Sequence, residues 1–165
     1  MRYADGPTTE AEVLIQAPVD RVWELVSDIE IPTRFSTELK GVKWLDGDAA
    51  AVGARFAGRN AHAAAGEWET ECVVTVCEPG RSFAWAVGDP DFPSATWRFD
   101  LEQEPGGVRL RQMAQLGPAP SGLTPAIEAM PEKEERIVAR RLAEHQANMQ
   151  ATVDGVKTLA EAGDR

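Results

Sequence analysis

The chain has 165 residues, 43% of them hydrophobic, which is typical of one globular domain with its own core. Its formal net charge of −10 argues against nucleic acid or an anionic membrane as a partner, because both attract basic proteins. Residues 1–10 lack the apolar core of a signal peptide, and no apolar run approaches the ~18 residues of a membrane span. We therefore expect no membrane insertion and a cytoplasmic location.

The few cysteines and histidines limit the chemistry that the chain can perform. Cys72 and Cys77 have an odd separation, which predicts opposite faces of one strand and no disulfide between them. His62 and His145 are the two histidines, too few for a zinc-type ligand cluster. No nucleotide-binding or phosphate-binding motif is evident, so we predict no metal and no cofactor.

The first third of the chain predicts a strand followed by two short helices. Residues 11–17 alternate between apolar and polar side chains like a strand. Pro18 suits the first turn of a helix, because the backbone N–H that proline lacks has no hydrogen-bond partner there in any case. Apolar residues at helical spacing follow at Val19, Val22, Val26 and Ile29. Pro32 interrupts this helix, so a second short helical turn is expected over residues 33–39.

About six strands follow, each bounded by turn signals. They are expected over residues 42–45, 53–62, 67–76, 83–87, 95–101 and 108–116. The clearest alternation places Trp68, Thr70 and Cys72 on one face and three glutamates on the other. Strands joined by short turns favour one antiparallel sheet.

A long C-terminal helix ending near Ala162 is predicted by an apolar stripe with steps of three and four residues. The stripe consists of Val138, Leu142, His145, Met149, Thr152, Val156 and Leu159. The element order therefore predicts an α+β fold in which this helix covers the concave face of a curved antiparallel sheet. We expect residues 1–10 to be a flexible terminus and residues 11–162 to form a single ligand-binding domain.

Three segments carry a resemblance to a known family. They are residues 13–36 (VLIQAPVDRVWELVSDIEIPTRFS), residues 52–87 with VGARFAGRNA and GEWETECVVTVCEPGRSFAWAV, and residues 148–161 (NMQATVDGVKTLAE). In this order they resemble the START-like SRPBCC superfamily, and within it the polyketide cyclase/dehydrase group. The resemblance implies a helix-grip fold with a deep apolar cavity between the sheet and the long helix.

The resemblance also implies candidate site residues. Asn148 matches the asparagine that aromatase/cyclases carry on the long helix, and Trp68 fits an aromatic pocket position. Residues 31–38 contain neither the tryptophan nor the tyrosine of those enzymes, and the strand expected to supply an inward arginine has Cys72 and Val74 instead.

His145 interrupts the apolar stripe and should point toward the sheet. It is a candidate catalytic acid or base, together with Asn148, or a hydrogen-bonding group for a ligand carbonyl or phenol. The alternative is a histidine satisfied within the core or on the helix flank. Leu142 and Met149, one turn to either side, are expected to contact the ligand.

Polar and aromatic residues on the inner face of the sheet complete the candidate ligand site. Asn60, expected across a hairpin from Trp68, and Gln112 on the last strand can hydrogen-bond a ligand or be satisfied structurally. The aromatic candidates are Phe56, Trp68, Phe83, Trp85, Trp97 and Phe99, of which part should form core instead.

The sequence therefore predicts binding of a hydrophobic, aromatic or polyketide-like small molecule in an internal cavity. Whether a cyclase- or dehydratase-like reaction accompanies binding is left open. The alternatives are a non-catalytic lipid or small-molecule carrier and a protein-partner module of the chaperone-activator kind. No exposed patch identifies a protein partner.

Overall fold

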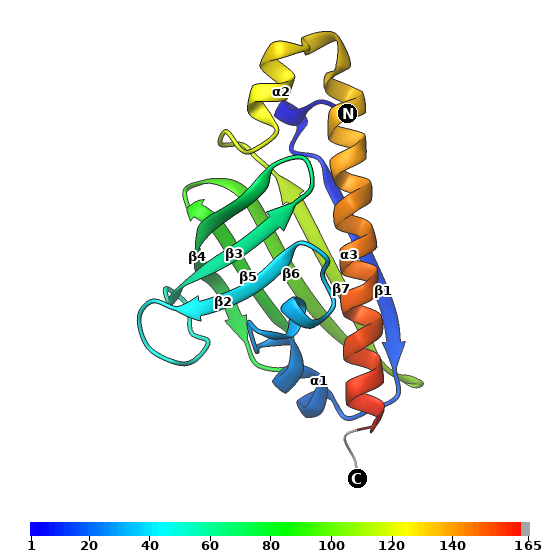
Figure 1. Cartoon of the computed structure of the whole chain (residues 1–165). Helices are drawn as coiled ribbons and strands as arrows, with labels where there is room; N and C mark the ends of the chain where they lie inside the picture. The colour runs from blue at the N-terminus through cyan, green and yellow to red at the C-terminus, as the bar shows by residue number, and fades with distance from the viewer. Residues whose placement is uncertain (163–165) are drawn as a thin grey trace.

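Seven antiparallel strands form one strongly curved sheet in the computed structural model, which describes residues 1–162 (Figure 1). The strand order is β1-β7-β6-β5-β4-β3-β2, so the first strand pairs with the last. The strands are β1 (Thr8–Ile15), β2 (Leu39–Trp44), β3 (Arg55–His62), β4 (Gly66–Glu78), β5 (Ser82–Asp89), β6 (Phe92–Glu104) and β7 (Gly107–Leu116). The helices are α1 (Val19–Val26), α2 (Thr124–Ala129) and α3 (Glu134–Ala162), with 3-10 turns η1 (Tyr3–Asp5), η2 (Ile31–Arg34) and η3 (Pro131–Lys133). This is the predicted helix-grip fold, which is confirmed.

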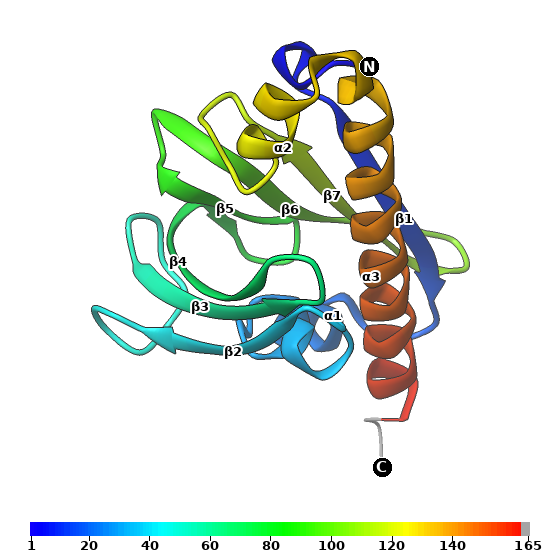
Figure 2. The ribbon, with the colours of Figure 1, turned by 45° about the horizontal axis from the view of Figure 1, so that its top comes forward.

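The long helix α3 lies along the open side of the curved sheet (Figure 2). It packs mainly on β1, with further contacts to β7, α1 and η2. Within the predicted stripe, five side chains are buried: Val138, His145, Met149, Thr152 and Val156. The stripe is therefore confirmed. No helix within residues 1–162 is long and apolar enough to cross a membrane.

Aromatic rings on the inner face of the sheet build most of the core. Phe83 and Trp85 on β5 pair with Phe99 and Trp97 on β6, so all four side chains point to the same face. The ring centroid of Trp85 lies 5.6 Å from that of Phe83, 5.9 Å from that of Phe56 and 6.1 Å from that of Phe99. Such tilted and edge contacts stabilise a core beyond the burial of the rings alone.

An irregularity in β4 corrects one expectation from the sequence. Cys72 pairs with Val87 and Cys77 with Phe83, with a shift of register between Val74 and Val76. The bulge reverses the alternation, so both cysteines face inward, and the prediction of opposite faces is wrong. Both thiols are free, and burial raises the pKa of Cys72 to about 12, which makes it a poor nucleophile.

The chain before the first expected strand makes contacts with α3. β1 begins at Thr8, three residues before the strand expected from the sequence. The Arg2 guanidinium lies 2.7 Å from a carboxylate oxygen of Glu134, and the backbone N–H of Tyr3 donates to the same carboxylate at 2.9 Å. The flexibility of residues 1–10 and the single-domain division stay predictions.

A close approach between η2 and α3 fixes one end of the sheet against the helix. Gly155 lies inside α3, where glycine ordinarily weakens a helix. A Cβ atom at this position would collide with the ring of Phe35, which directly follows η2. The absent side chain thus lets the segment leading into β2 lie close to α3, where the candidate site is formed.

Candidate functional site

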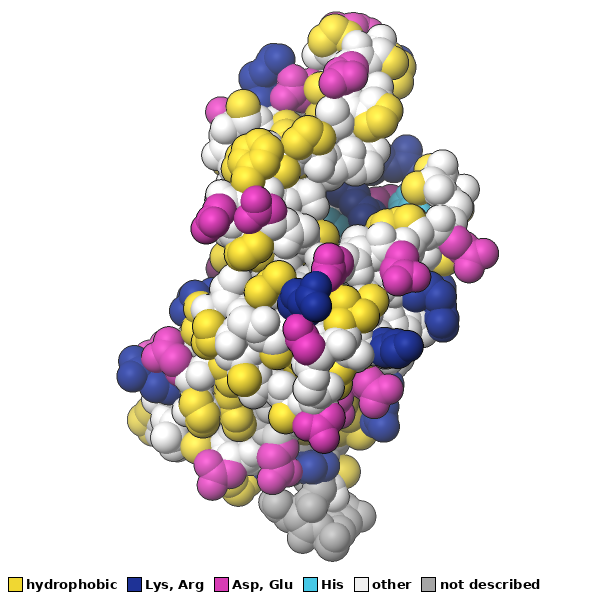
Figure 3. Space-filling view, turned by 90° about the vertical axis from the view of Figure 1, so that its left-hand side faces the viewer, with side chains coloured by type: hydrophobic (Ala, Val, Ile, Leu, Met, Phe, Trp, Pro, Cys, Tyr) yellow, Lys and Arg dark blue, Asp and Glu magenta, His cyan; other side chains and the backbone are white. Residues whose placement is uncertain are grey.

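The space between the sheet and α3 is packed at one end and open at the other. Toward α1, the side chains at the centre of the core are fully buried, as at Phe83 and Phe99, both 0% exposed. Toward α2, inward-facing side chains stay only half-buried: Asn60, Trp68, Thr70, Val87 and Trp97. Figure 3 shows the surface hollowed toward the α2 end, with basic, acidic and histidine atoms inside. We call this space the α2-end hollow.

A pocket of about 460 Å³ lies at the seam between α3, the segment before β2 and the tip of the β3–β4 hairpin. Its apolar lining comes from Phe35, Ala61, Ala63, Ala147 and Ala151. Its polar lining comes from Thr37, Glu38, His62, Glu144 and Asn148. A mixed lining of this kind suits a ligand with an apolar body and a few polar groups.

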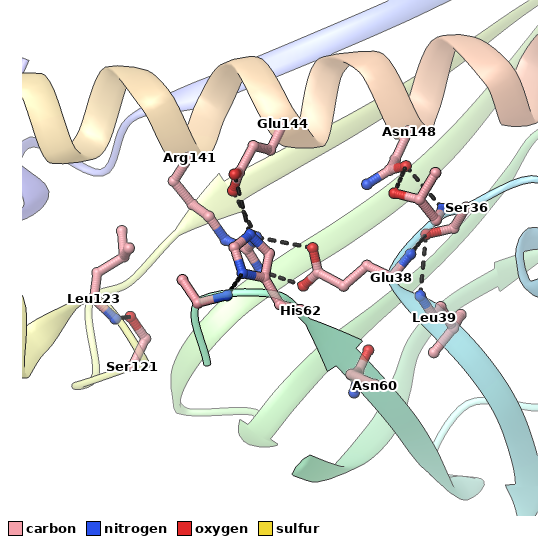
Figure 4. Close-up of polar contacts among 12 residues, drawn as sticks. Ser36, Glu38, Leu39, Asn60, His62, Ser121, Leu123, Arg141, Glu144 and Asn148 are labelled. Carbon is pink, nitrogen blue, oxygen red and sulfur yellow. Dashed lines mark hydrogen bonds and ion pairs between the residues drawn. The ribbon is translucent and has the colours of Figure 1, made fainter. Parts of the chain in front are cut away.

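Ion pairs close this seam (Figure 4). Arg141 on α3 makes a bidentate pair with Glu38, in which Nη1 lies 2.8 Å from Oε2 and Nη2 bonds Oε1. The same Nη1 donates to Glu144 at 3.0 Å, and Glu144 lies 3.1 Å from His62 Nε2. The backbone N–H of Ala64 donates to His62 Nδ1 at 3.0 Å, so the ring proton belongs on Nε2, toward Glu144.

The shifted pKa values of Arg141 and Glu144 favour the charged forms of these two side chains. Burial disfavours the charge on Arg141, but hydrogen bonds and attraction to Glu38 and Glu144 outweigh burial and raise its pKa. Burial likewise opposes ionisation of Glu144, yet hydrogen bonds from His62 and Arg141 lower its pKa. The cluster therefore holds α3 to the β2–β3 edge through charge-assisted bonds.

Asn148 connects α3 to the segment before β2. Its Oδ1 accepts hydrogen bonds from the backbone N–H of Thr37 at 3.0 Å and from the Thr37 hydroxyl at 3.1 Å. The side chain lines the pocket at the seam, but its carbonyl oxygen is occupied by these two bonds. This geometry supports a positioning role, and a catalytic role for Asn148 stays a prediction.

His145 lies on the inner face of α3, directly over the sheet. Its side chain is 6% exposed, and its ring meets that of Trp97 edge-on, with centroids 4.8 Å apart. Burial, reinforced by the positive charge of Arg141, lowers the pKa of His145 to about 3. The ring is therefore neutral near neutral pH, and proton acceptance by it is unfavourable.

The other predicted site residues divide between the core and the α2-end hollow. Asn60 pairs directly with Trp68, as expected, and its amide makes a 3.4 Å bond to the carbonyl of Gly58. Gln112 faces inward and is 3% exposed. Leu142 is half-buried, whereas five candidates belong to the packed core: Phe56, Phe83, Trp85, Phe99 and Met149.

The sequence did not point to the ion-pair cluster of Glu38, His62, Arg141 and Glu144. Arg141 and Glu144 are one turn apart on a helix, which is an ordinary surface pattern. Their partners lie 103 and 82 residues away in sequence, so no local spacing relates them. The polar half of the pocket at the seam becomes visible only in the folded chain.

A second pocket of about 410 Å³ lies at the opposite end of the molecule, toward α1. Trp23 and Trp44 line it, together with half-buried Cys77 and the acidic residues Glu24 and Asp28. None of the residues predicted to bind ligand lines this pocket.

Several solved protein structures share this fold. The polyketide cyclase-like protein Cgl2372 of Corynebacterium glutamicum is 29% identical, with 94% of this chain and 92% of that chain covered and a TM-score of 0.64. TTHA0849 of Thermus thermophilus is 18% identical over 96% of this chain and 100% of that chain, with a TM-score of 0.62.

A di-domain ARO/CYC protein, StfQ of the steffimycin biosynthetic pathway, shares the fold at 16% identity and a TM-score of 0.71. The similarity covers 94% of this chain and 51% of StfQ. No curated protein matches the chain. The family model described as polyketide cyclase/dehydrase and lipid transport matches residues 7–161. The chain therefore belongs to the polyketide cyclase/dehydrase and lipid transport family.

Proposed function

We propose that the protein binds a hydrophobic, aromatic or polyketide-like small molecule in the α2-end hollow, between the sheet and α3. The observation that carries this proposal is the half-buried state of Trp97. It lies on the inner face of β6, beneath α3, where a filled core would bury it completely. Aromatic rings held partly exposed inside a concave space are suited to stack on an apolar ligand.

Two further observations support binding as the function. The pocket at the seam adds an apolar wall of four alanines and Phe35 beside the α2-end hollow. The low pKa of His145 favours a neutral hydrogen-bonding role, because a general base works best with a pKa near the operating pH. We therefore propose a binding protein, with lipid-like carriage as the alternative use of the same space. The cytoplasmic location and the absence of a nucleic-acid partner stay predictions.

Filling the α2-end hollow with an indole should abolish most of the binding. Ala95 is half-buried on the same face of β6 as Trp97 and pairs with Val87 and Leu116. Ala95→Trp is expected to weaken the affinity for a dihydroxynaphthalene by at least about tenfold, because the indole occupies the ligand's volume. Isothermal titration calorimetry measures the dissociation constant.

Thr96→Trp is the matched control, because Thr96 is the next residue and faces the outside of the sheet. It should bind within about twofold of the wild type. Undiminished affinity in Ala95→Trp would place the ligand outside the α2-end hollow.

A further inference from the structure

Two polar residues lie between the sheet and α3, and neither side chain hydrogen-bonds another residue of the described part of the chain. Gln112 on β7 is 3% exposed, and its Oε1 has no partner among residues 1–162. His145 on α3 is 6% exposed, and its ring contacts Trp97 without a hydrogen bond to any residue in the described part of the chain. Buried polar groups in native proteins nearly always find partners, so the unpaired Oε1 of Gln112 indicates a place where a bound molecule can donate a hydrogen bond.

Both side chains lie where the packed core gives way to the α2-end hollow. Gln112 pairs with Phe99, which is fully buried, and is two residues from Ala114, which pairs with half-buried Trp97. His145 lies over Trp97 from the opposite side of the same space. The two groups therefore face the floor of the hollow from β7 and from α3.

The chemistry of the two groups defines what they can recognise. A neutral imidazole offers one donor and one acceptor, and the amide of Gln112 offers two donors and one acceptor. Neither carries a charge to offset that of a buried ammonium or carboxylate ligand group, whose desolvation is costly. A hydroxyl group on an aromatic ring both donates and accepts, and so matches either side chain.

We propose that Gln112 and His145 are ligand-contacting residues that select a neutral, hydroxylated aromatic molecule. This inference rests on the proposed function and adds the polar chemistry of the ligand. Its consequence is a pair of opposite effects. Replacing Gln112 with an apolar side chain of similar shape removes an unsatisfied acceptor from the free protein. Replacing either side chain removes a group that binds the ligand hydroxyls.

The test compares a dihydroxynaphthalene with its dimethoxy counterpart, which keeps the ring and loses the donors. Wild-type protein should bind the dihydroxy form about tenfold more tightly by calorimetry. His145→Phe and Gln112→Leu should each reduce this preference, and the double variant should abolish it. At about pH 7 the urea midpoints of the variants should equal or exceed that of the wild type.

Gln115→Leu is the matched control on the same strand. Its amide faces the other side of β7 and donates to the carbonyl of Gly6 at 3.2 Å. It should keep the ligand preference and lower the urea midpoint. Equal binding of the two naphthalenes by the wild type, or a preference retained in the double variant, would overturn the inference while leaving the proposed function in place. If neither naphthalene binds, the proposed function fails and the inference fails with it.

Discussion

His145→Phe is expected to remove about 3 kcal/mol of acid-induced destabilisation between about pH 6.5 and pH 4.5. Burial and the nearby Arg141 lower the pKa of His145 from 6.5 to about 3 in the folded protein. Between these two values the unfolded chain binds a proton that the folded chain does not. Stability from this residue is therefore complete above pH 6.5 and falls by about 1.4 kcal/mol per pH unit as the pH drops toward 3.

Urea denaturation of both proteins across this pH range measures the effect. Carboxylates with lowered pKa, such as Glu144, also contribute acid sensitivity, but they do so in both proteins. The difference between the two curves therefore isolates His145. Parallel curves would mean that His145 keeps an ordinary pKa and is solvated in the folded state, contrary to its place over Trp97.

Arg141→Met should cost about 3 kcal/mol of unfolding free energy near neutral pH. The methionine keeps the aliphatic packing of α3 but leaves the carboxylate of Glu38, only 12% exposed at its side chain, without its bidentate partner. It also removes the bond that Arg141 makes to Glu144. An uncompensated charge at this depth is more destabilising than the loss of the ion pair itself.

The double variant Arg141→Met/Glu38→Leu should recover most of this stability, because neither charge is then buried alone. Arg140→Met is the control, since Arg140 is the neighbouring exposed arginine on α3 and should change stability by less than about 0.5 kcal/mol. A cost for Arg141→Met no larger than that of Arg140→Met would show that the cluster does not close the seam.

The predictable parts of the fold are the helices and strands whose apolar residues recur at a regular spacing along the chain. Five of the six side chains in the stripe from Val138 to Val156 are buried, because steps of three and four residues return to one helix face. The pairing of Asn60 with Trp68 followed from a short connection between two alternating strands. The bulge between Val74 and Val76 reverses the face of Cys77, and no residue in that strand signals it.

The candidate site was predictable only where its residues lie on a periodic face. His145 and Gln112 could be assigned to inner faces by counting along their helix and strand. Glu38 and His62 meet Arg141 and Glu144 only because η2 packs against α3 at Gly155 and brings the β2–β3 edge to the helix. The division between packed core and hollow likewise depends on how far the sheet curves, which distinguishes buried Phe99 from half-buried Trp97.

The five tryptophans allow a direct test of whether the ligand lies in the α2-end hollow. Their indole N–H signals, assigned by single Trp→Phe variants, can be followed by NMR while a dihydroxynaphthalene is titrated into the protein. Trp68 and Trp97 line the hollow, whereas Trp23 and Trp44 line the pocket toward α1. Our expectation is that the signals of Trp68 and Trp97 shift most and that those of Trp23 and Trp44 stay in place. Shifts confined to Trp23 and Trp44, or no shift at all, would contradict it.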